Sequence, residues 1–341
     1  MESLEEILNQ ALAFYNDDKL FQASRKVEVL TAEVAKMEKD SNVSSTEKQK
    51  LSEFKKKLSS DPKVLKMRQQ SSECATLLHD CTSMESWEMC YDGESTKVHY
   101  RKEPDSPMHS VRVRGILNVD FVNLASLIYE TDLYKLFWWF VRDMKEIKKL
   151  GRCEKAVHGI YQVFFPIKDR EIPILGYGCD GLDEDDSFVL FFRSLREDDR
   201  DINGNVVGVP KQPSGTVRIE MKVAGMRFVP VSRKAVDMTI IANLDPKISF
   251  VPRPLLNWAT RSVFRFGLRI LESKANELHN MPHMERMQTD PFYEWFNSRV
   301  EDYFRSHPEK LQGAERGRTS FDPEKEQKIS KPPRLALLGV K

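Results

Sequence analysis

The fold is indicated by the stretch Val251-Pro252-Arg253-Pro254-Leu255-Leu256-Asn257-Trp258, which opens a long apolar segment that continues to His279. Apolar residues recur in this segment at three- and four-residue spacing, which predicts a helix with one buried stripe. Such a helix needs a large partner surface, and a block of β-strand patterns precedes it. We expect these strands to curl around the helix and to enclose a cavity that suits an apolar ligand better than catalysis. The stripe consists of Leu255, Leu256, Ala259, Val263, Phe266, Gly267, Ile270, Leu271 and Leu278, and the strands are predicted at roughly 96–101, 110–118, 154–165, 173–179, 187–195, 216–223 and 236–244.

The composition is that of a globular protein without an obvious anionic partner. The chain has 341 residues, enough for one large domain with extensions or for two domains, and a net charge of +1, so we expect no nucleic-acid partner. Its five cysteines are odd in number and lack CxxC pairs, which favours reduced thiols over a disulfide framework or a zinc site. The apolar runs are too short for a membrane span, and the acidic N-terminus lacks a secretory signal, so we predict a cytoplasmic protein.

Four segments are expected along the chain. Residues 1–68 have helical periodicity only and predict a helical N-terminal extension, whereas residues 69–280 carry the strands and the long helix. Residues 281–306 predict an amphipathic helix with Phe292, Trp295, Phe296 and Phe304, and the charge-rich residues 307–341 predict a disordered tail. Within the second segment, Asp120 and Asp132 can cap two short helices, at Phe121 to Tyr129 and at Leu133 to Val141.

The order of these elements, together with several motifs, resembles the START family of lipid-transfer domains. The motif Phe165-Pro166-Ile167-Lys168-Asp169-Arg170-Glu171 stands where that family has a proline followed by an Arg-Asp pair. The turn Asp245-Pro246 and the stretch from Val251 to Trp258 are similar to the family's aspartate-proline turn and the start of its long helix. The resemblance covers about residues 70–280 and implies an α+β helix-grip fold, in which a curved antiparallel sheet wraps a long C-terminal helix over a lipid cavity.

One motif is similar to the phosphatidylcholine-transfer branch of the family. That branch has Tyr-Arg-x-x-Trp-Asp in its second short helix, and this chain has Tyr134-Lys135-Leu136-Phe137-Trp138-Trp139. Lysine keeps the positive charge but not the bidentate geometry of arginine, and Trp139 replaces the acidic residue. The resemblance implies lipid-binding roles for Tyr134, Lys135, Trp138, Tyr161, Trp258, Phe266 and Ile270.

Charged residues on two strands are further candidates for a polar head group. The segment 216–223 alternates apolar and charged residues, so its charged face looks either into the cavity, where Arg218 and Glu220 would hold a head group, or into solvent. Arg193 is a pocket candidate because its strand is otherwise apolar, although an arginine at a strand end also reaches water.

A row of cations beside the apolar stripe suggests a membrane contact. Arg261, Arg265 and Arg269 are spaced by four residues. The row either docks the helix on an anionic bilayer, where each cation contributes ~1 kcal/mol, or forms an ordinary solvated face.

The predicted function is intracellular lipid binding and transfer between membranes, without catalysis, cofactor or metal. Phospholipid is the leading ligand and sterol the second, and the protein is expected to be cytoplasmic and peripherally membrane-associated. No nucleophile elbow, phosphate loop or HExxH motif is present, and Pro282 separates His279 from His283. Two alternatives stay open. One is a lipid-regulated scaffold that recruits a protein partner through residues 1–68, and the other is an enzyme of the same cavity fold with an acid, base or nucleophile inside the pocket.

Overall fold

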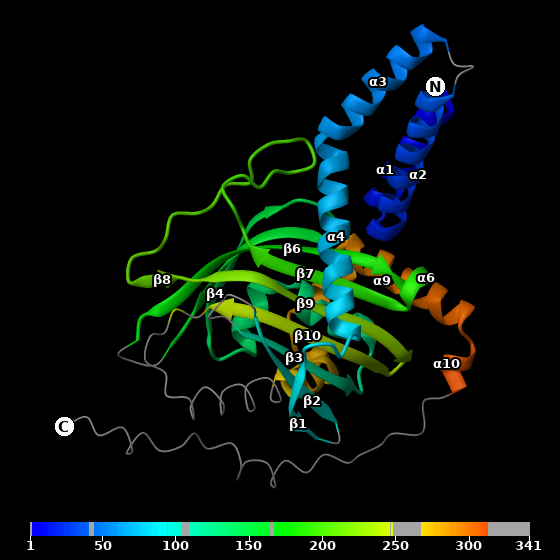
Figure 1. Cartoon of the computed structure of the whole chain (residues 1–341). Coiled ribbons are helices and arrows are strands. Elements are labelled where there is room, and N and C mark those ends of the chain that lie inside the picture. The colour runs from blue at the N-terminus through cyan, green and yellow to red at the C-terminus, as the bar shows by residue number, and fades with distance from the viewer. Residues whose placement is uncertain are drawn as a thin grey trace, which may run out of the picture.

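The computed structural model describes residues 2–40, 44–93, 95–103, 109–163, 167–245, 247 and 267–312. In this part of the chain ten strands form one sheet in the order β1-β2-β3-β10-β9-β7-β6-β5-β4 with antiparallel neighbours, and β8 pairs in parallel with β6 (Figure 1). The strands are β1 Glu88–Asp92, β2 Thr96–Lys102, β3 His109–Leu117, β4 Val141–Lys149, β5 Glu154–Tyr161, β6 Asp169–Gly181, β7 Ser187–Ser194, β8 Thr216–Arg218, β9 Glu220–Ser232 and β10 Ala235–Asp245. The helices are α1 Glu2–Asn16, α2 Leu20–Lys39, α3 Ser45–Ser60, α4 Pro62–Thr82, α5 Phe121–Tyr129, η1 Thr131–Leu136, α6 Leu182–Asp185, η2 Leu278–Asn280, α8 His283–Thr289, α9 Pro291–Ser306 and α10 Glu309–Gln312.

The antiparallel sheet with a helical N-terminal part confirms the predicted fold class, but the segment after α5 differs from the prediction. A second α-helix was expected to Val141, whereas the chain forms the short 3₁₀ turn η1 and then the strand β4. β4 reads Val-Arg-Asp-Met-Lys-Glu-Ile-Lys-Lys and lies at one edge of the sheet. Edge strands carry charges that discourage pairing with other chains, so β4 lacks the apolar alternation by which a strand is recognised in a sequence.

The two faces of the sheet have different partners, because successive side chains on a strand point to opposite sides. On β7, Phe188, Leu190 and Phe192 face the inner side, where α5 and α9 lie. The alternating residues Val189 and Phe191 face the outer side and pack in a core shared with α4.

α4 joins the outer face of the sheet to a helical arm made of α1, α2 and α3, which projects beyond the sheet (Figure 1). Asp61 caps α4 by accepting hydrogen bonds from two amides of its first turn, and Pro62 occupies the first position. The first half of α4 packs into the core of the arm through Met67, and the second half packs on the sheet through Leu77. The boundary expected between residues 68 and 69 therefore falls inside one continuous helix.

Among the described helices on the inner side of the sheet, α5, the helix over residues 267–276 and α9 share one hydrophobic core. Residues 251–266, where the long helix was expected to begin, lie outside the described residues. The buried residues that these later segments contribute are Leu268, Leu271, Ala275, Phe292, Tyr293, Phe296, Val300, Tyr303 and Phe304.

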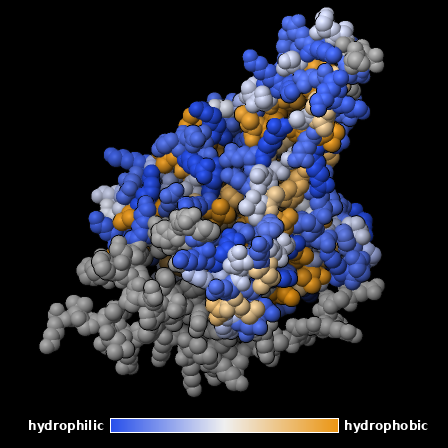
Figure 2. Space-filling model, viewed as in Figure 1, coloured by the Kyte–Doolittle hydropathy of each residue, from blue (hydrophilic) through white to orange (hydrophobic). Residues whose placement is uncertain are grey.

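The described surface is mostly hydrophilic. Figure 2 shows hydrophobic side chains in scattered patches, on the arm and below it, among a larger area of hydrophilic residues. Among the described helices, none has the length and apolar composition needed to cross a bilayer.

Candidate ligand-binding cavity

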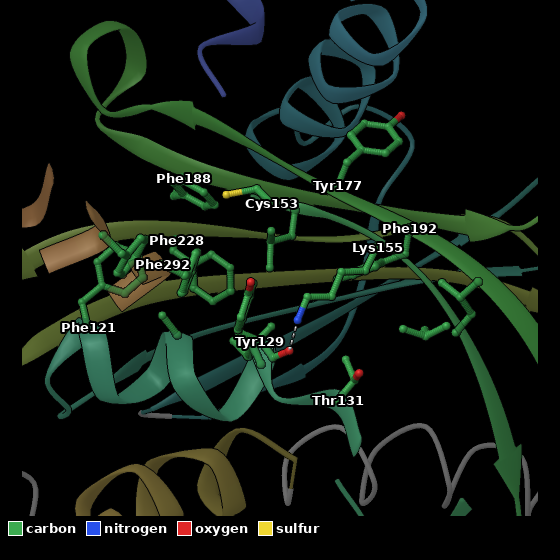
Figure 3. A pocket seen from close by; sticks show the side chains of 17 residues that line it. Phe121, Tyr129, Thr131, Cys153, Lys155, Tyr177, Phe188, Phe192, Phe228 and Phe292 are labelled. Carbon is green, nitrogen blue, oxygen red and sulfur yellow. Dashed lines mark hydrogen bonds between the residues drawn. The ribbon is translucent and has the colours of Figure 1, made fainter. Parts of the chain in front are cut away.

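A small apolar cavity lies between the inner face of the sheet and the helices α5 and α9 (Figure 3). Its volume is about 90 Å³. Aromatic rings form much of its wall, and aliphatic and polar side chains of the sheet, α5 and η1 supply the rest. The residues that line it are Phe121, Ala125, Ile128, Tyr129, Thr131, Cys153, Lys155, Val157, Ile174, Gly176, Tyr177, Phe188, Leu190, Phe192, Phe228, Phe292 and Phe296.

The cavity is smaller than most ligand sites. Pockets for small molecules commonly measure about 300–1,000 Å³, and an apolar cavity of about 150 Å³ holds one benzene molecule. A volume of about 90 Å³ therefore holds only a short part of an acyl chain. Binding of a whole lipid requires side chains of the wall to move.

The long helix was expected to roof this cavity, and its first part, residues 251–266, lies outside the described residues. The described part, residues 267–276, contributes no residue to the wall. It packs instead against β3 and α5, where Glu272 accepts hydrogen bonds from Asn118 and the backbone carbonyl of Ala275 accepts one from Asn123. α9 lies at one side of the cavity and lines it with Phe292 and Phe296.

Lys155 stands at the rim, where the cavity meets an open groove of about 820 Å³. Tyr129, Thr131 and Lys155 line both spaces. The Lys155 side chain is only 16% exposed, and its ammonium donates a hydrogen bond of 3.2 Å to the backbone carbonyl of Tyr129. Burial lowers the pKa of Lys155, against the opposing effect of Glu130. The rim therefore holds a partly desolvated cation beside an apolar space.

The groove is charged but balanced. Arg286 pairs with Glu130 at 2.5 Å and with Asp132 at 2.7 Å, and Lys149 lies 3.7 Å from Asp290. The lining residues Lys145, Lys149, Lys155 and Arg286 match Glu130, Asp132, Glu146 and Asp290 in number, so the groove has no net formal charge. It can receive a polar head group that carries charge.

An aromatic cluster lies beside the cavity wall. Tyr134, Trp138, Phe140 and Tyr161 pack on a core that includes Val157 and Ile174, two residues of the cavity wall. The ring centroids of Trp138 and Phe140 lie 5.5 Å apart, and those of Phe140 and Tyr161 lie 6.4 Å apart. We call this group the aromatic plug. The structure thus brings together three residues that the sequence proposed for lipid binding, next to the cavity rather than in its wall.

The charged candidates from the sequence lie elsewhere. Lys135 is exposed, and Arg193 faces the outer side of the sheet, where its guanidinium bonds Asp199 at 2.6 and 2.7 Å. Arg218 also faces the outer side, bonded at 2.5 Å to the buried carboxylate of Glu171. The described structure therefore places neither arginine in the cavity wall, because register puts both on the face opposite to Phe192.

Of the remaining candidates, three are described by the structure but do not line the cavity, and four lie outside the described residues. Glu220 is exposed at the start of β9, and Ile270 packs against the inner core without reaching the cavity. Arg269 is half-buried. Trp258, Arg261, Arg265 and Phe266 lie outside the described residues.

Lys155 was missed by sequence reasoning. Its strand carries polar residues on both faces, with Glu154 and His158 on one and Lys155 on the other, so alternation does not tell which face is internal. The one available signal was that Lys155 shares its face with Val157 and Gly159, which leaves it the single charged side chain there.

Solved structures with a similar architecture include two human proteins of the START group. Human STARD10 matches with a TM-score of 0.52 and 14% identity, over 70% of this chain and 87% of that chain. Human StAR-related lipid transfer protein 5 matches with a TM-score of 0.52 and 13% identity, over 62% of this chain and 97% of that chain. No protein-family model matches the sequence, and no curated protein matches it. The chain therefore has the START helix-grip fold.

Proposed function

We propose that this protein binds a lipid in its inner cavity and carries it between membranes without catalysing a reaction. One observation supports this most directly: an apolar cavity opens past Lys155 onto a charged groove. An amphipathic lipid matches that arrangement, because its chain leaves water at ~0.8 kcal/mol per buried methylene while its head group stays in the groove. The START fold of the chain agrees with it.

A charged head group suits the groove better than a sterol hydroxyl. Phospholipid is therefore the leading ligand class and sterol the second. Either lipid needs a larger volume than the ~90 Å³ of the cavity, so lipid binding must displace side chains of the wall. The aromatic plug adjoins the wall through Val157 and Ile174, and we assign it the role of the movable part.

The surface beside the plug suits contact with a bilayer. Leu136, Trp139 and Ile167 are 50%, 66% and 37% exposed. Trp139 packs edge-on against Phe140 of the plug. Tryptophan favours the interface of a bilayer, and the exposed cations Lys135 and Lys168 lie in the same two segments. These residues form the proposed membrane face, so the protein would be peripherally associated.

The test is transfer of fluorescent phospholipid or fluorescent sterol between donor and acceptor vesicles. We expect transfer of phospholipid above the rate without protein, and slower transfer by Trp139→Ser, with Val29→Ser on the arm as a control for loss of an exposed apolar residue. If neither lipid is transferred or bound by the intact protein, the proposal fails.

A further inference from the structure

Lys155 is the cation at the cavity rim that has the weakest anionic partner. Its ammonium lies 3.9 Å from the nearest carboxylate oxygen, on Glu146, and its closest hydrogen bond goes to a neutral carbonyl at 3.2 Å. Arg286, in the same groove, bonds two carboxylates at 2.5 and 2.7 Å. Arg286 therefore has two close anionic partners, whereas the more deeply buried Lys155 has none as close.

Burial without a close counter-charge is costly. A cation removed from water needs short bonds to acceptors to offset its lost hydration, and the side chain of Lys155 is only 16% exposed. The ring of Tyr129, whose centroid lies 3.4 Å from the ammonium, supplies part of that compensation. An anion that binds at the rim would supply the rest, and it would replace water there with a charge-assisted bond.

We infer that Lys155 binds the anionic group of an amphiphile, a carboxylate or a phosphate, whose apolar chain fills the cavity behind it. The inference rests on the proposed lipid-binding function and adds a ligand charge and an orientation. The chain runs from the rim toward Phe228 and Phe292, and the head group points into the groove (Figure 3). Thr131 places a hydroxyl at the same rim as a second donor.

The test compares Lys155→Met, Lys155→Arg and the control Lys145→Met. Lys145 lines the same groove but not the cavity, and its side chain is 75% exposed beside Asp143. Each intact protein is titrated by calorimetry with three ligands. These are dodecanoate, dodecanol as an uncharged ligand of the same chain length, and a short-chain phosphatidate. Methionine keeps an unbranched side chain only one heavy atom shorter and removes a buried charge, so Lys155→Met should fold, which thermal unfolding checks.

We expect Lys155→Met to weaken binding of the anionic ligand at least about tenfold and to leave dodecanol binding unchanged. Lys155→Arg should retain most of the affinity, and Lys145→Met should match the wild type. A preference for dodecanoate identifies a carboxylate ligand, and a preference for phosphatidate identifies a phosphate ligand.

Equal affinity of Lys155→Met and wild type for the preferred anion would overturn the inference while leaving lipid binding intact. Equal binding of dodecanol and dodecanoate by the wild type would also overturn it. Absence of binding for all three ligands, together with absent vesicle transfer, would instead remove the proposed function. Acetylation of Lys155, read by mass spectrometry, gives an independent measure, because a bound anion should protect this amine and leave Lys145 reactive.

Discussion

The ammonium of Lys155 lies 3.4 Å from the centroid of the Tyr129 ring, so β5 and α5 meet at the rim of the cavity. The same ring also stacks on Phe292 of α9, with centroids 3.9 Å apart and planes 2° apart. Tyr129 thus links the rim cation to the C-terminal helix. α9 is consequently a structural part of the cavity, and changes in this helix should affect ligand binding as well as stability.

The Tyr129 ring should contribute far more to stability than its hydroxyl. The hydroxyl is buried and has no hydrogen-bond partner among the described residues. Tyr129→Phe should therefore leave the free energy of unfolding unchanged or raise it, because an unpaired buried polar group is removed. Tyr129→Ala should cost about 3–5 kcal/mol through the cavity it leaves. Urea unfolding measures both, and a large loss in Tyr129→Phe would contradict this account.

Arg299 should anchor α9 to the sheet. Its guanidinium bonds Asp180 at 2.5 Å and Asp183 at 3.1 Å, and the Asp180 side chain is fully buried. Arg299→Met leaves that carboxylate without its partner and should cost about 3–5 kcal/mol. The control is Arg305→Met on the same helix, where an exposed pair with Asp302 is worth about 0–1 kcal/mol. Equal losses in the two variants would show that α9 is not held by this pair.

Gly225 should be required for the close approach of α4 to the sheet. A Cβ atom there would lie 2.1 Å from Leu77 Cδ2 and 2.4 Å from the backbone oxygen of Leu190. Gly225→Ala should therefore destabilise the protein and loosen the arm, which hydrogen exchange over α4 would detect. Gly151→Ala is the control, because its Cβ would meet its nearest neighbour at an ordinary 3.4 Å. Unchanged exchange over α4 in Gly225→Ala would argue against this packing.

Stability should decrease in mild acid because of His283. The residue is fully buried, neither ring nitrogen has a hydrogen-bond partner in the described part of the chain, and burial lowers its pKa. Glu130 and Asp132 oppose that shift, and Arg286 adds to it. The unfolded chain then binds more protons than the native state once the pH falls below about 6.5, so the native state loses stability there.

His283→Leu should remove this pH dependence. Relative to the wild type, its stability should rise as the pH is lowered from about 8 to about 5, measured by urea unfolding at each pH. The exposed His279→Leu serves as the control and should follow the wild type. Parallel pH profiles for His283→Leu and the wild type would exclude a role for this imidazole.

Charge reversal at Arg261, Arg265 and Arg269 should slow lipid transfer to anionic vesicles and leave lipid occupancy unchanged. Each cation near an anionic surface contributes about 1 kcal/mol, and screening by salt should reduce the difference from the wild type. Transfer rates to neutral vesicles provide the control. Equal transfer rates to anionic vesicles at low salt would count against the membrane role of this row.

Much of the fold was predictable from local patterns. The N-terminal region is helical as its periodicity predicts, and the aromatic residues predicted for a C-terminal amphipathic helix lie on α9, which begins at Pro291 behind its cap Asp290. Tyr134 and Trp138 were predicted near the ligand, and they form the plug beside the cavity. β4 was missed because a charged edge strand has no apolar alternation.

Much of the order of helices and strands follows from periodicity and capping residues, because these act between neighbours in the chain, whereas the helix-grip architecture was implied by the resemblance to the START family. Which side of a strand becomes internal does not follow from them. Phe192 lines the cavity and Arg193 bonds Asp199 on the outer face, although the two are adjacent. The pairing register across the sheet determines which side chains are internal. Packing of α5 and α9 on that face then brings Lys155, Tyr129 and Phe292, far apart in the chain, to one rim.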